Sequence, residues 1–207
     1  MMVNTASARV PLVVDLDGTL HAEDLSWLLF VHAARHNPFI VLQALFTWLL
    51  RGKAAMKDLC GKKCRLSLDR LCWHGDVLSF IRQAKAEGVP LVLATGTPQH
   101  WAEACNRYLG APFDRVLGSD LQTNLIGKAK AQALVSAYGV QGFDYIGNSG
   151  QDLHVWPCCR NILIANAPAR VEEKARAIDR PVTKVFAGTV CKQTTPFTNV
   201  GSGDVDR

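Results

Sequence analysis

Short apolar runs alternate with longer segments of helical periodicity along most of the chain. Each apolar run has the length of a buried strand, and the segment after it repeats its apolar residues with helical spacing. The expected strands span 10–15, 91–95, 115–117, 145–147, 162–165 and, at an edge of the sheet, 183–186. The expected helices span 24–35, 39–50, a segment from 53 onward, 76–88, 98–109, 128–138, 152–158 and 171–178. This alternation predicts an α/β fold with a Rossmann-like parallel sheet and crossover helices.

The helices between the first two strands form an insertion in this pattern. Asp24 and Asp76 stand where helix N-caps are expected. Asn37-Pro38 and Gly52 interrupt the helical segments, because the residue before proline avoids helical backbone and glycine favours a break. The expected division is a core of residues 9–19 and 79–187, a helical insertion of residues 20–78, and a disordered tail of residues 188–207.

The segment Val13-Val14-Asp15-Leu16-Asp17-Gly18-Thr19 carries the strongest chemical signal in the chain. Side chains alternate along a strand, so Asp15 and Asp17 would share a side if the strand continued. Gly18 favours a turn in which the backbone leaves the sheet close to a ligand. Crowded carboxylates repel each other unless a cation or a shared proton relieves them. The pattern indicates a metal site, an acid–base pair, or both, and its structural alternative is a strand that ends in an Asp-Gly turn.

Other polar segments occur near the carboxyl ends of the later strands. Thr95-Gly96-Thr97 closes the second strand, Lys130 lies in the helix after the third, and the segment from Asn148 to Asp152 follows the fourth. Ligands of open parallel sheets bind beyond the carboxyl ends of the strands. These segments are therefore expected to converge with the two aspartates on one site. Structural alternatives remain, with Thr95 and Asp152 as helix caps and Lys130 as a solvated lysine.

Together these segments resemble the four sequence motifs of the haloacid dehalogenase (HAD) superfamily of phosphohydrolases. The run from Asp15 to Thr19 is similar to motif one, Leu91 to Thr97 to motif two, and Lys130 to the lysine of motif three. The run from Tyr145 to Asp152 resembles the G-D-x-x-x-D form of motif four, but Asn148 stands where the first aspartate is usual. The resemblance extends from about Val10 to Phe186 and implies an α-helical cap inserted after the first strand.

The resemblance implies a Mg²⁺-dependent phosphatase that forms an aspartyl-phosphate. Asp15 would be the nucleophile and Asp17 the general acid and then the base, while Thr95 and Lys130 complete the catalytic set. Lys130 is favoured over Lys128 because its spacing to Leu134 fits the motif better. Contacts to the substrate are implied for Gly18, Thr19, Gly96 and Thr97. Ligands for Mg²⁺ are implied at Asp15, Asp17 through its backbone carbonyl, Asn148 and Asp152.

Asn148 is the departure with chemical consequences, because an amide oxygen in place of a carboxylate removes one negative charge from the metal site. Hard cations prefer carboxylates, so the affinity for Mg²⁺ is expected to fall. A second hypothesis follows, in which the chain is a catalytically weak or inactive binding or regulatory module. Asp15, Asp17, Thr95 and Lys130 argue against it. A phosphotransferase is a third hypothesis, since it would share the aspartyl intermediate.

A narrower resemblance concerns the tryptophan-rich segment after motif one, Gly142 to Tyr145, and Asp152 to Trp156. These segments are similar to the HAD domain that is fused to some UbiA-type polyprenyl prenyltransferases. This resemblance implies a polyprenyl-linked or other amphipathic phosphate as substrate. It also implies a membrane prenyltransferase or a lipid surface as partner.

Composition narrows the possible partners and the location. The formal net charge is +5, but the positive residues are scattered and form no stripe with aromatic residues, so nucleic acid is not an expected partner. The seven cysteines follow no secretory signal, which favours reduced thiols and a cytoplasmic protein.

The stretch from Leu25 to Leu50 is the most apolar in the chain. His32, Arg35 and Asn37-Pro38 interrupt it, so a transmembrane helix is not expected. Its second half, Phe39 to Leu50, is expected to pack as a buried cap helix. The alternative is an interfacial element at the inner membrane, with tryptophan at the lipid boundary.

Overall fold

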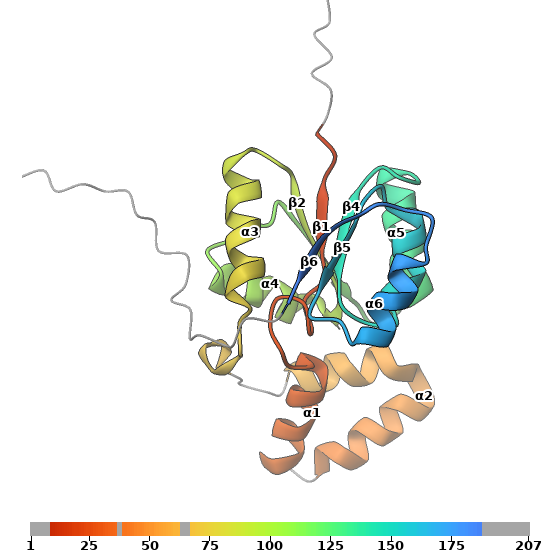
Figure 1. Cartoon of the computed structure of the whole chain (residues 1–207). Coiled ribbons are helices and arrows are strands. Elements are labelled where there is room, and N and C mark those ends of the chain that lie inside the picture. The colour runs from red at the N-terminus through yellow and green to blue at the C-terminus, as the bar shows by residue number, and fades with distance from the viewer. Residues whose placement is uncertain (1–8, 37–38, 63–66, 188–207) are drawn as a thin grey trace, which may run out of the picture.

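The computed structural model describes residues 9–36, 39–62 and 67–187, and six parallel strands form its sheet (Figure 1). The strand order is β3-β2-β1-β4-β5-β6. The strands are β1 Leu12–Val14, β2 Leu91–Pro98, β3 Arg115–Ser119, β4 Asp144–Gly147, β5 Ile162–Ala165 and β6 Val182–Phe186. Each neighbouring pair is parallel. The predicted α/β parallel sheet and the edge position of β6 are therefore confirmed.

Helices cover both faces of this sheet, with α3 and α4 on one face and α5 and α6 on the other (Figure 1). Their bounds are α3 Gly75–Ala86, α4 Gln99–Tyr108, α5 Gly127–Tyr138 and α6 Ala169–Arg176. Successive side chains of β1 point to opposite faces of the sheet. Leu12 and Val14 belong to the apolar cluster under α3 and α4, and Val13 belongs to the apolar cluster under α5 and α6. Burial on both faces explains why these strands are continuous apolar runs.

Some expected boundaries are wrong for local reasons. Asp76 does not cap α3, because the helix begins one residue earlier and the Asp76 carboxylate accepts only the N–H of Val77, at 2.8 Å. The expected helix over 152–158 is instead two 3₁₀ turns, η2 Asp152–His154 and η3 Trp156–Cys158. Pro157 lacks the backbone N–H that a continuous α-helix would need there.

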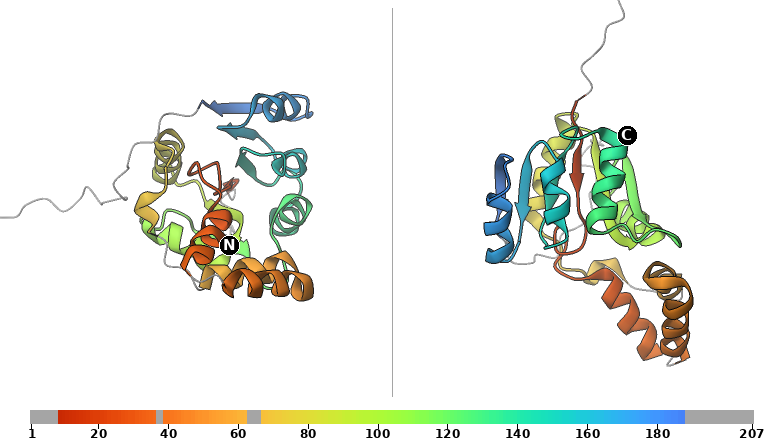
Figure 2. Two further views of the ribbon diagram at one scale, coloured as in Figure 1. Left: turned by 90° about the horizontal axis from the view of Figure 1, so that it is seen from below. Right: turned by 90° about the vertical axis from the view of Figure 1, so that its right-hand side faces the viewer.

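Two cap helices, α1 Leu25–His36 and α2 Phe39–Lys62, lie beyond the carboxyl ends of the strands (Figures 1 and 2). The short turn η1 Leu68–Arg70 leads from them back to the sheet. Asp24 caps α1 as expected, since its Oδ1 accepts the N–H of Trp27 at 2.9 Å. Gly52 interrupts α2 with φ 80° and ψ 179°, which confirms the predicted break. The expectations for Asn37-Pro38 and for residues 188–207 lie outside the described residues.

The first half of α2 is exposed, so the expectation that Phe39 to Leu50 packs as a buried helix is wrong. Ile40 and Ala44 are buried in the same apolar cluster as Leu29 of α1. The exposed apolar side chains of this segment are Phe39, Val41, Leu42, Leu45, Phe46, Trp48, Leu49 and Leu50. A segment that is apolar all round carries no periodic signal for which of its faces is covered.

Two further expectations concern the cysteines and the membrane. Cys105, Cys158 and Cys159 are free thiols, but Cys72 is disulfide-bonded, so the expectation of reduced thiols is wrong at Cys72. Sequence spacing does not reveal which thiols approach each other. Within the described ranges, no helix combines the length and the apolar character that crossing a bilayer requires.

Candidate active site

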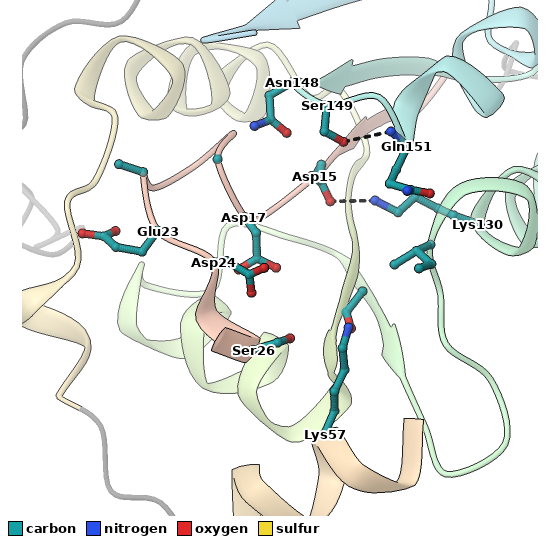
Figure 3. Close-up of a pocket in the computed structure, with 14 residues that line it drawn as sticks. Asp15, Asp17, Glu23, Asp24, Ser26, Lys57, Lys130, Asn148, Ser149 and Gln151 are labelled. Atoms are coloured by element: carbon teal, nitrogen blue, oxygen red, sulfur yellow. Dashed lines mark hydrogen bonds and ion pairs between the residues drawn. The ribbon is translucent and has the colours of Figure 1, made fainter. Parts of the chain in front are cut away.

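A polar pocket of about 370 Å³ lies between the carboxyl ends of the strands and the cap (Figure 3). It is lined from the segment after β1, both cap helices, the end of β2, the start of α5 and the loop after β4. The lining residues are Asp15, Asp17, Gly18, Ala22, Glu23, Asp24, Ser26, Lys57, Gly96, Ile126, Lys130, Asn148, Ser149 and Gln151. Segments far apart in the sequence thus meet where the strand ends meet.

A buried ion pair stands at the base of this pocket. Lys130 Nζ donates to Asp15 Oδ1 at 2.6 Å, and the two residues are 3% and 6% exposed (Figure 3). The same ammonium donates to the Tyr145 hydroxyl at 3.1 Å, and that hydroxyl donates to Asp152 Oδ1 at 2.6 Å. Lys128 is exposed. It is therefore Lys130 of α5 that joins the strand-end carboxylates.

Burial sets the electrostatics of this chain of groups. Burial raises the pKa of Asp15 from 3.8 to about 7; Lys130 opposes the increase, and Asp152 and Asp17 add to it. Burial alone would lower the pKa of Lys130, but Asp15 and Asp152 outweigh it and the pKa is raised. Burial and Asp152 also raise the pKa of Tyr145 well above its usual range. Lys130 thus stays cationic and Tyr145 protonated, while Asp15 titrates near neutral pH.

The Asp17 carboxylate is held by three donors from two other elements. Its Oδ1 accepts the backbone N–H of Leu25, at the start of α1, at 2.8 Å. Its Oδ2 accepts the hydroxyls of Thr97 at 2.7 Å and Thr95 at 3.3 Å. Asp17 lines the pocket and also ties the cap to the end of β2.

The residues expected to contact phosphate divide into two groups. Gly18 and Gly96 line the pocket. Thr19, Thr95 and Thr97 have no exposed surface and do not line it. In this structure the Thr95 and Thr97 side chains position Asp17, and their hydroxyls do not face the pocket.

Asn148 lines the pocket and carries an unsatisfied side-chain oxygen. Its Oδ1 is buried and has no hydrogen-bond partner. A Cβ on Gly18, whose φ is +75°, would lie 1.9 Å from Asn148 Nδ2, so the amide rests directly on this glycine. A buried polar atom without a partner carries a free-energy cost that a ligand can remove.

Asp152 shapes the loop that carries Asn148. Its Oδ2 accepts the N–H groups of Asn148 at 3.1 Å and Ser149 at 2.9 Å, and the Ser149 hydroxyl at 2.8 Å. Its side chain is 1% exposed and does not line the pocket. Asp152 therefore supports the backbone of Asn148, while Asp15, Asp17 and Asn148 line the pocket.

Two of the residues implied as Mg²⁺ ligands bring side-chain oxygens of a suitable type to the pocket lining. Asp15 and the unsatisfied Asn148 Oδ1 are hard oxygen donors on the same pocket, which is the donor type that Mg²⁺ selects. Among the described residues, no three His, Cys, Asp or Glu side chains are grouped to hold a metal ion. The Asp17 backbone carbonyl and phosphate oxygens would have to complete the coordination shell.

The cap contributes a lysine that the sequence analysis did not identify. Lys57 of α2 donates to the Gly96 carbonyl at 3.0 Å and to Asn124 Oδ1 at 3.2 Å. Figure 3 shows this side chain extending from the cap toward the centre of the pocket. No local pattern marks this lysine as part of a site, because its partners Gly96 and Asn124 lie far away in sequence.

His21 is a second residue that the sequence analysis missed. It is fully buried, with Nε2 3.7 Å from Asp17 Oδ1 and Nδ1 3.5 Å from Glu23 Oε2. His21 is the main cause of the lowered pKa of Glu23. Trp73 packs edge-on against the imidazole, with ring centroids 5.2 Å apart. The imidazole thus stands between two carboxylates that line the pocket.

An apolar groove of about 380 Å³ adjoins the polar pocket within the cap. Its lining residues are Asp24, Ser26, Trp27, Phe30, Trp48, Met56 and Lys57. Asp24, Ser26 and Lys57 line both cavities. The site therefore has a charged end at the strands and an apolar end between the cap helices.

Solved structures with a similar fold include known phosphatases. A protein of unknown function from Bordetella pertussis Tohama I aligns with a TM-score of 0.61 at 15% identity, covering 87% of this chain and 99% of its own. A substrate-bound phosphoserine phosphatase aligns with a TM-score of 0.56 at 13% identity, covering 91% and 94%. A phospho-aspartyl intermediate analogue of phosphoserine phosphatase aligns with a TM-score of 0.56 at 14% identity, covering 86% and 93%. At these identities the likeness concerns the fold.

Sequence comparison identifies the family. The protein y4nM of Sinorhizobium fredii is 30% identical over 168 residues, which is 81% of this chain but 32% of y4nM. The chain thus spans about a third of the length of this relative. The model of the haloacid dehalogenase-like hydrolases matches residues 12–156, the range that contains Asp15, Asp17, Lys130 and Asn148. The chain therefore belongs to the haloacid dehalogenase-like hydrolase family.

Proposed function

We propose that this protein is a Mg²⁺-dependent phosphatase that hydrolyses a phosphomonoester through a phosphorylated Asp15. The observation that carries the proposal is the buried pair of Asp15 and Lys130, 2.6 Å apart, at the base of a polar pocket that Asp17 also lines. A carboxylate nucleophile needs a cation to offset the negative charge of the phosphate it attacks. Lys130 supplies that charge.

The reaction would have two steps. A carboxylate oxygen of Asp15 attacks phosphorus, the P–O bond to the alcohol breaks, and Asp17 donates a proton to the departing oxygen. Asp17 then removes a proton from water as the water oxygen attacks the phosphorus of the aspartyl-phosphate. The Asp15–phosphate bond breaks, inorganic phosphate leaves, and Asp17 is protonated again.

Asp15, Asn148 Oδ1 and the Asp17 backbone carbonyl would hold Mg²⁺. When bound, the ion supplies positive charge that draws carboxylate and phosphate oxygens together. The unsatisfied Asn148 oxygen supports this assignment. Because Asn148 is uncharged, we expect weaker binding of Mg²⁺ than a second carboxylate would give.

The substrate we propose is an amphipathic phosphate, with polyprenyl-linked phosphates as one fitting class. The apolar groove that shares Asp24, Ser26 and Lys57 with the polar pocket supports this choice. A phosphate beside Asp15 would place a linear apolar substituent toward Trp27, Phe30 and Met56. A small polar alcohol would leave that groove unfilled.

The test is phosphate release from alkyl phosphates of increasing chain length and from farnesyl phosphate, with and without Mg²⁺. We expect Mg²⁺-dependent release that falls at least about 10³-fold in Asp15→Asn and Lys130→Ala. Lys128→Ala is the matched control, because Lys128 is an exposed lysine on the same helix. Release that persists in Asp15→Asn would contradict the covalent route.

Asn148 also favours a second candidate, a binding module that retains the phosphatase fold. In that case calorimetry would detect binding of a phosphomonoester to the wild type. None of the alkyl phosphates, nor farnesyl phosphate, would release phosphate. Adding alcohols during turnover tests for a phosphotransferase, because phosphate would then appear on the added alcohol.

A further inference from the structure

The cap carries an apolar surface that neither the fold nor the proposed reaction requires. We define the apolar cap face as the exposed apolar residues of α1 and α2, namely Trp27, Phe39, Val41, Leu42, Leu45, Phe46, Trp48, Leu49 and Leu50. Phe46 is 64% exposed and Leu49 is 71% exposed. Contiguous exposed apolar surface is uncommon on soluble proteins and marks contact with an apolar partner.

Helical geometry gathers much of this face into one stripe. Phe39, Leu42, Phe46 and Leu49 follow one another at spacings of three and four residues, so they lie along one side of α2. Ile40 and Ala44, on the other side, are buried with α1. The first half of α2 therefore packs against α1 through Ile40 and Ala44 and exposes most of its large apolar side chains.

The amino-acid sequence of the segment that carries the apolar cap face has a charge that suits an anionic surface. No aspartate or glutamate occurs between Leu25 and Lys57, whereas Arg35, Arg51 and Lys53 occur there. Bilayers with anionic lipids attract such basic residues at their surface, while apolar side chains insert below the headgroups. A second copy of this chain would instead bring the same positive charges together.

The apolar cap face also continues into the site. Trp27 and Trp48 belong both to this face and to the lining of the apolar groove, and the groove shares Lys57 with the polar pocket. Figure 2 shows the cap projecting from the sheet at the end where these cavities lie. The path from the apolar cap face to Asp15 therefore runs through the apolar groove and then through the polar pocket.

We infer that the apolar cap face docks on an anionic lipid bilayer, with α2 lying in the interface. Trp27 and Trp48 would sit near the headgroups, where amphipathic aromatic rings are favoured. Docking would open the apolar groove toward the acyl chains. The inference concerns attachment to the bilayer and holds whether or not Asp15 turns over phosphate.

The experiment is co-sedimentation with vesicles of phosphatidylcholine and phosphatidylglycerol, compared with vesicles of phosphatidylcholine alone. We expect the wild type to bind the mixed vesicles more strongly, and the Phe46→Glu/Leu49→Glu variant to lose at least about tenfold in partitioning. Val140→Glu is the matched control, because Val140 is 62% exposed and lies in the loop before β4, away from the cap. Both variants place the charge at exposed positions, so circular dichroism should match the wild type.

Tryptophan fluorescence gives a second measurement. Trp27 and Trp48 are exposed, whereas Trp73, Trp101 and Trp156 are buried. Mixed vesicles should shift the emission to the blue, and brominated lipids should quench it, in the wild type but not in Trp27→Phe/Trp48→Phe.

The inference is overturned if the wild type does not co-sediment with the mixed vesicles. It is also overturned if Phe46→Glu/Leu49→Glu binds these vesicles with the same affinity as Val140→Glu. A concentration-dependent dimer that this variant abolishes, without vesicle binding by the wild type, would assign the face to a second copy. Hydrolysis of a short alkyl phosphate, measured in parallel, separates failure of docking from failure of the reaction.

Discussion

At the scale of single residues, burial changes the pKa values of the charged groups in the site. Asp15 is nearly inaccessible to water, and its nearest cation is also buried. Desolvation penalises the carboxylate more than Lys130 stabilises it, so the pKa of Asp15 rises to about 7. Asp15 therefore gains affinity for protons on folding, and the stability of the protein must depend on pH.

The first prediction concerns this linkage in the metal-free protein. The folded state binds more protons than the unfolded state between the two pKa values of Asp15, 3.8 and about 7. The stabilisation of the protonated form is therefore complete below about pH 4 and is lost as the pH rises through about 7. Urea unfolding in EDTA should show this contribution falling by roughly 3 kcal/mol over that range. Asp15→Asn should remove the dependence, and an unchanged slope in Asp15→Asn would refute the assignment.

The second prediction concerns Asn148. Asn148→Asp replaces the unsatisfied amide oxygen with a carboxylate, so Mg²⁺ should bind about tenfold more tightly or better. Isothermal titration with MgCl₂ measures the change. Ser149→Ala is the control, because Ser149 lines the same pocket but contributes its hydroxyl to Asp152. Equal Mg²⁺ affinity in Asn148→Asp and wild type would exclude position 148 from the metal site.

At the scale of elements, Tyr145 joins three parts of the core. It belongs to β4, accepts a hydrogen bond from Lys130 of α5, and donates one to Asp152 of η2. Asp152 in turn holds the backbone of the loop that carries Asn148. The position of the loop thus depends on the Tyr145 hydroxyl, through Asp152.

The third prediction follows from this connection. Tyr145→Phe keeps the ring but leaves a buried Asp152 oxygen without its donor, so the protein should lose about 1–3 kcal/mol of stability. Thermal and urea unfolding measure the loss. Tyr138→Phe is a useful comparison, because Tyr138 at the end of α5 is only partly buried. Equal stability of Tyr145→Phe and wild type would mean that water replaces the hydroxyl.

At the scale of the whole molecule, the site needs the cap as much as the sheet. The segment after β1 supplies Asp15 and Asp17 and α5 supplies Lys130, while α2 supplies Lys57 and both cap helices line the apolar groove. Under the proposed function, the groove would select the apolar part of the substrate and the residues around Asp15 would carry out the reaction. A change in the groove should alter which substrates react while the reaction itself is retained.

The fourth prediction tests that separation. Met56→Trp adds bulk to the groove and should lower kcat/KM for long alkyl phosphates at least about tenfold, with little change for short ones. Met56→Leu keeps the volume close to that of methionine and is the control. A uniform loss across all chain lengths would indicate that Met56 acts on the fold or on the reaction instead.

The order of the elements could be predicted from the sequence because each strand is a short apolar run and each crossover helix repeats with its own period. The α/β sheet, the position of β6 and the break at Gly52 follow from such local signals. Local patterns were insufficient where several interactions compete. Pro157 divides the expected helix into two turns, and Asp76 is not the N-cap because α3 begins at Gly75.

The sequence by itself determined the class of fold and the strand ends where charged residues gather, because these depend on short-range periodicity and on parallel strands ending at one edge. Only the tertiary structure decided which side chains face the pocket. It turned Thr95, Thr97 and Asp152 toward protein donors and acceptors, and it brought His21 and Lys57 to the site. It also left one side of α2 exposed, because a helix that is apolar all round is covered only where another element reaches it.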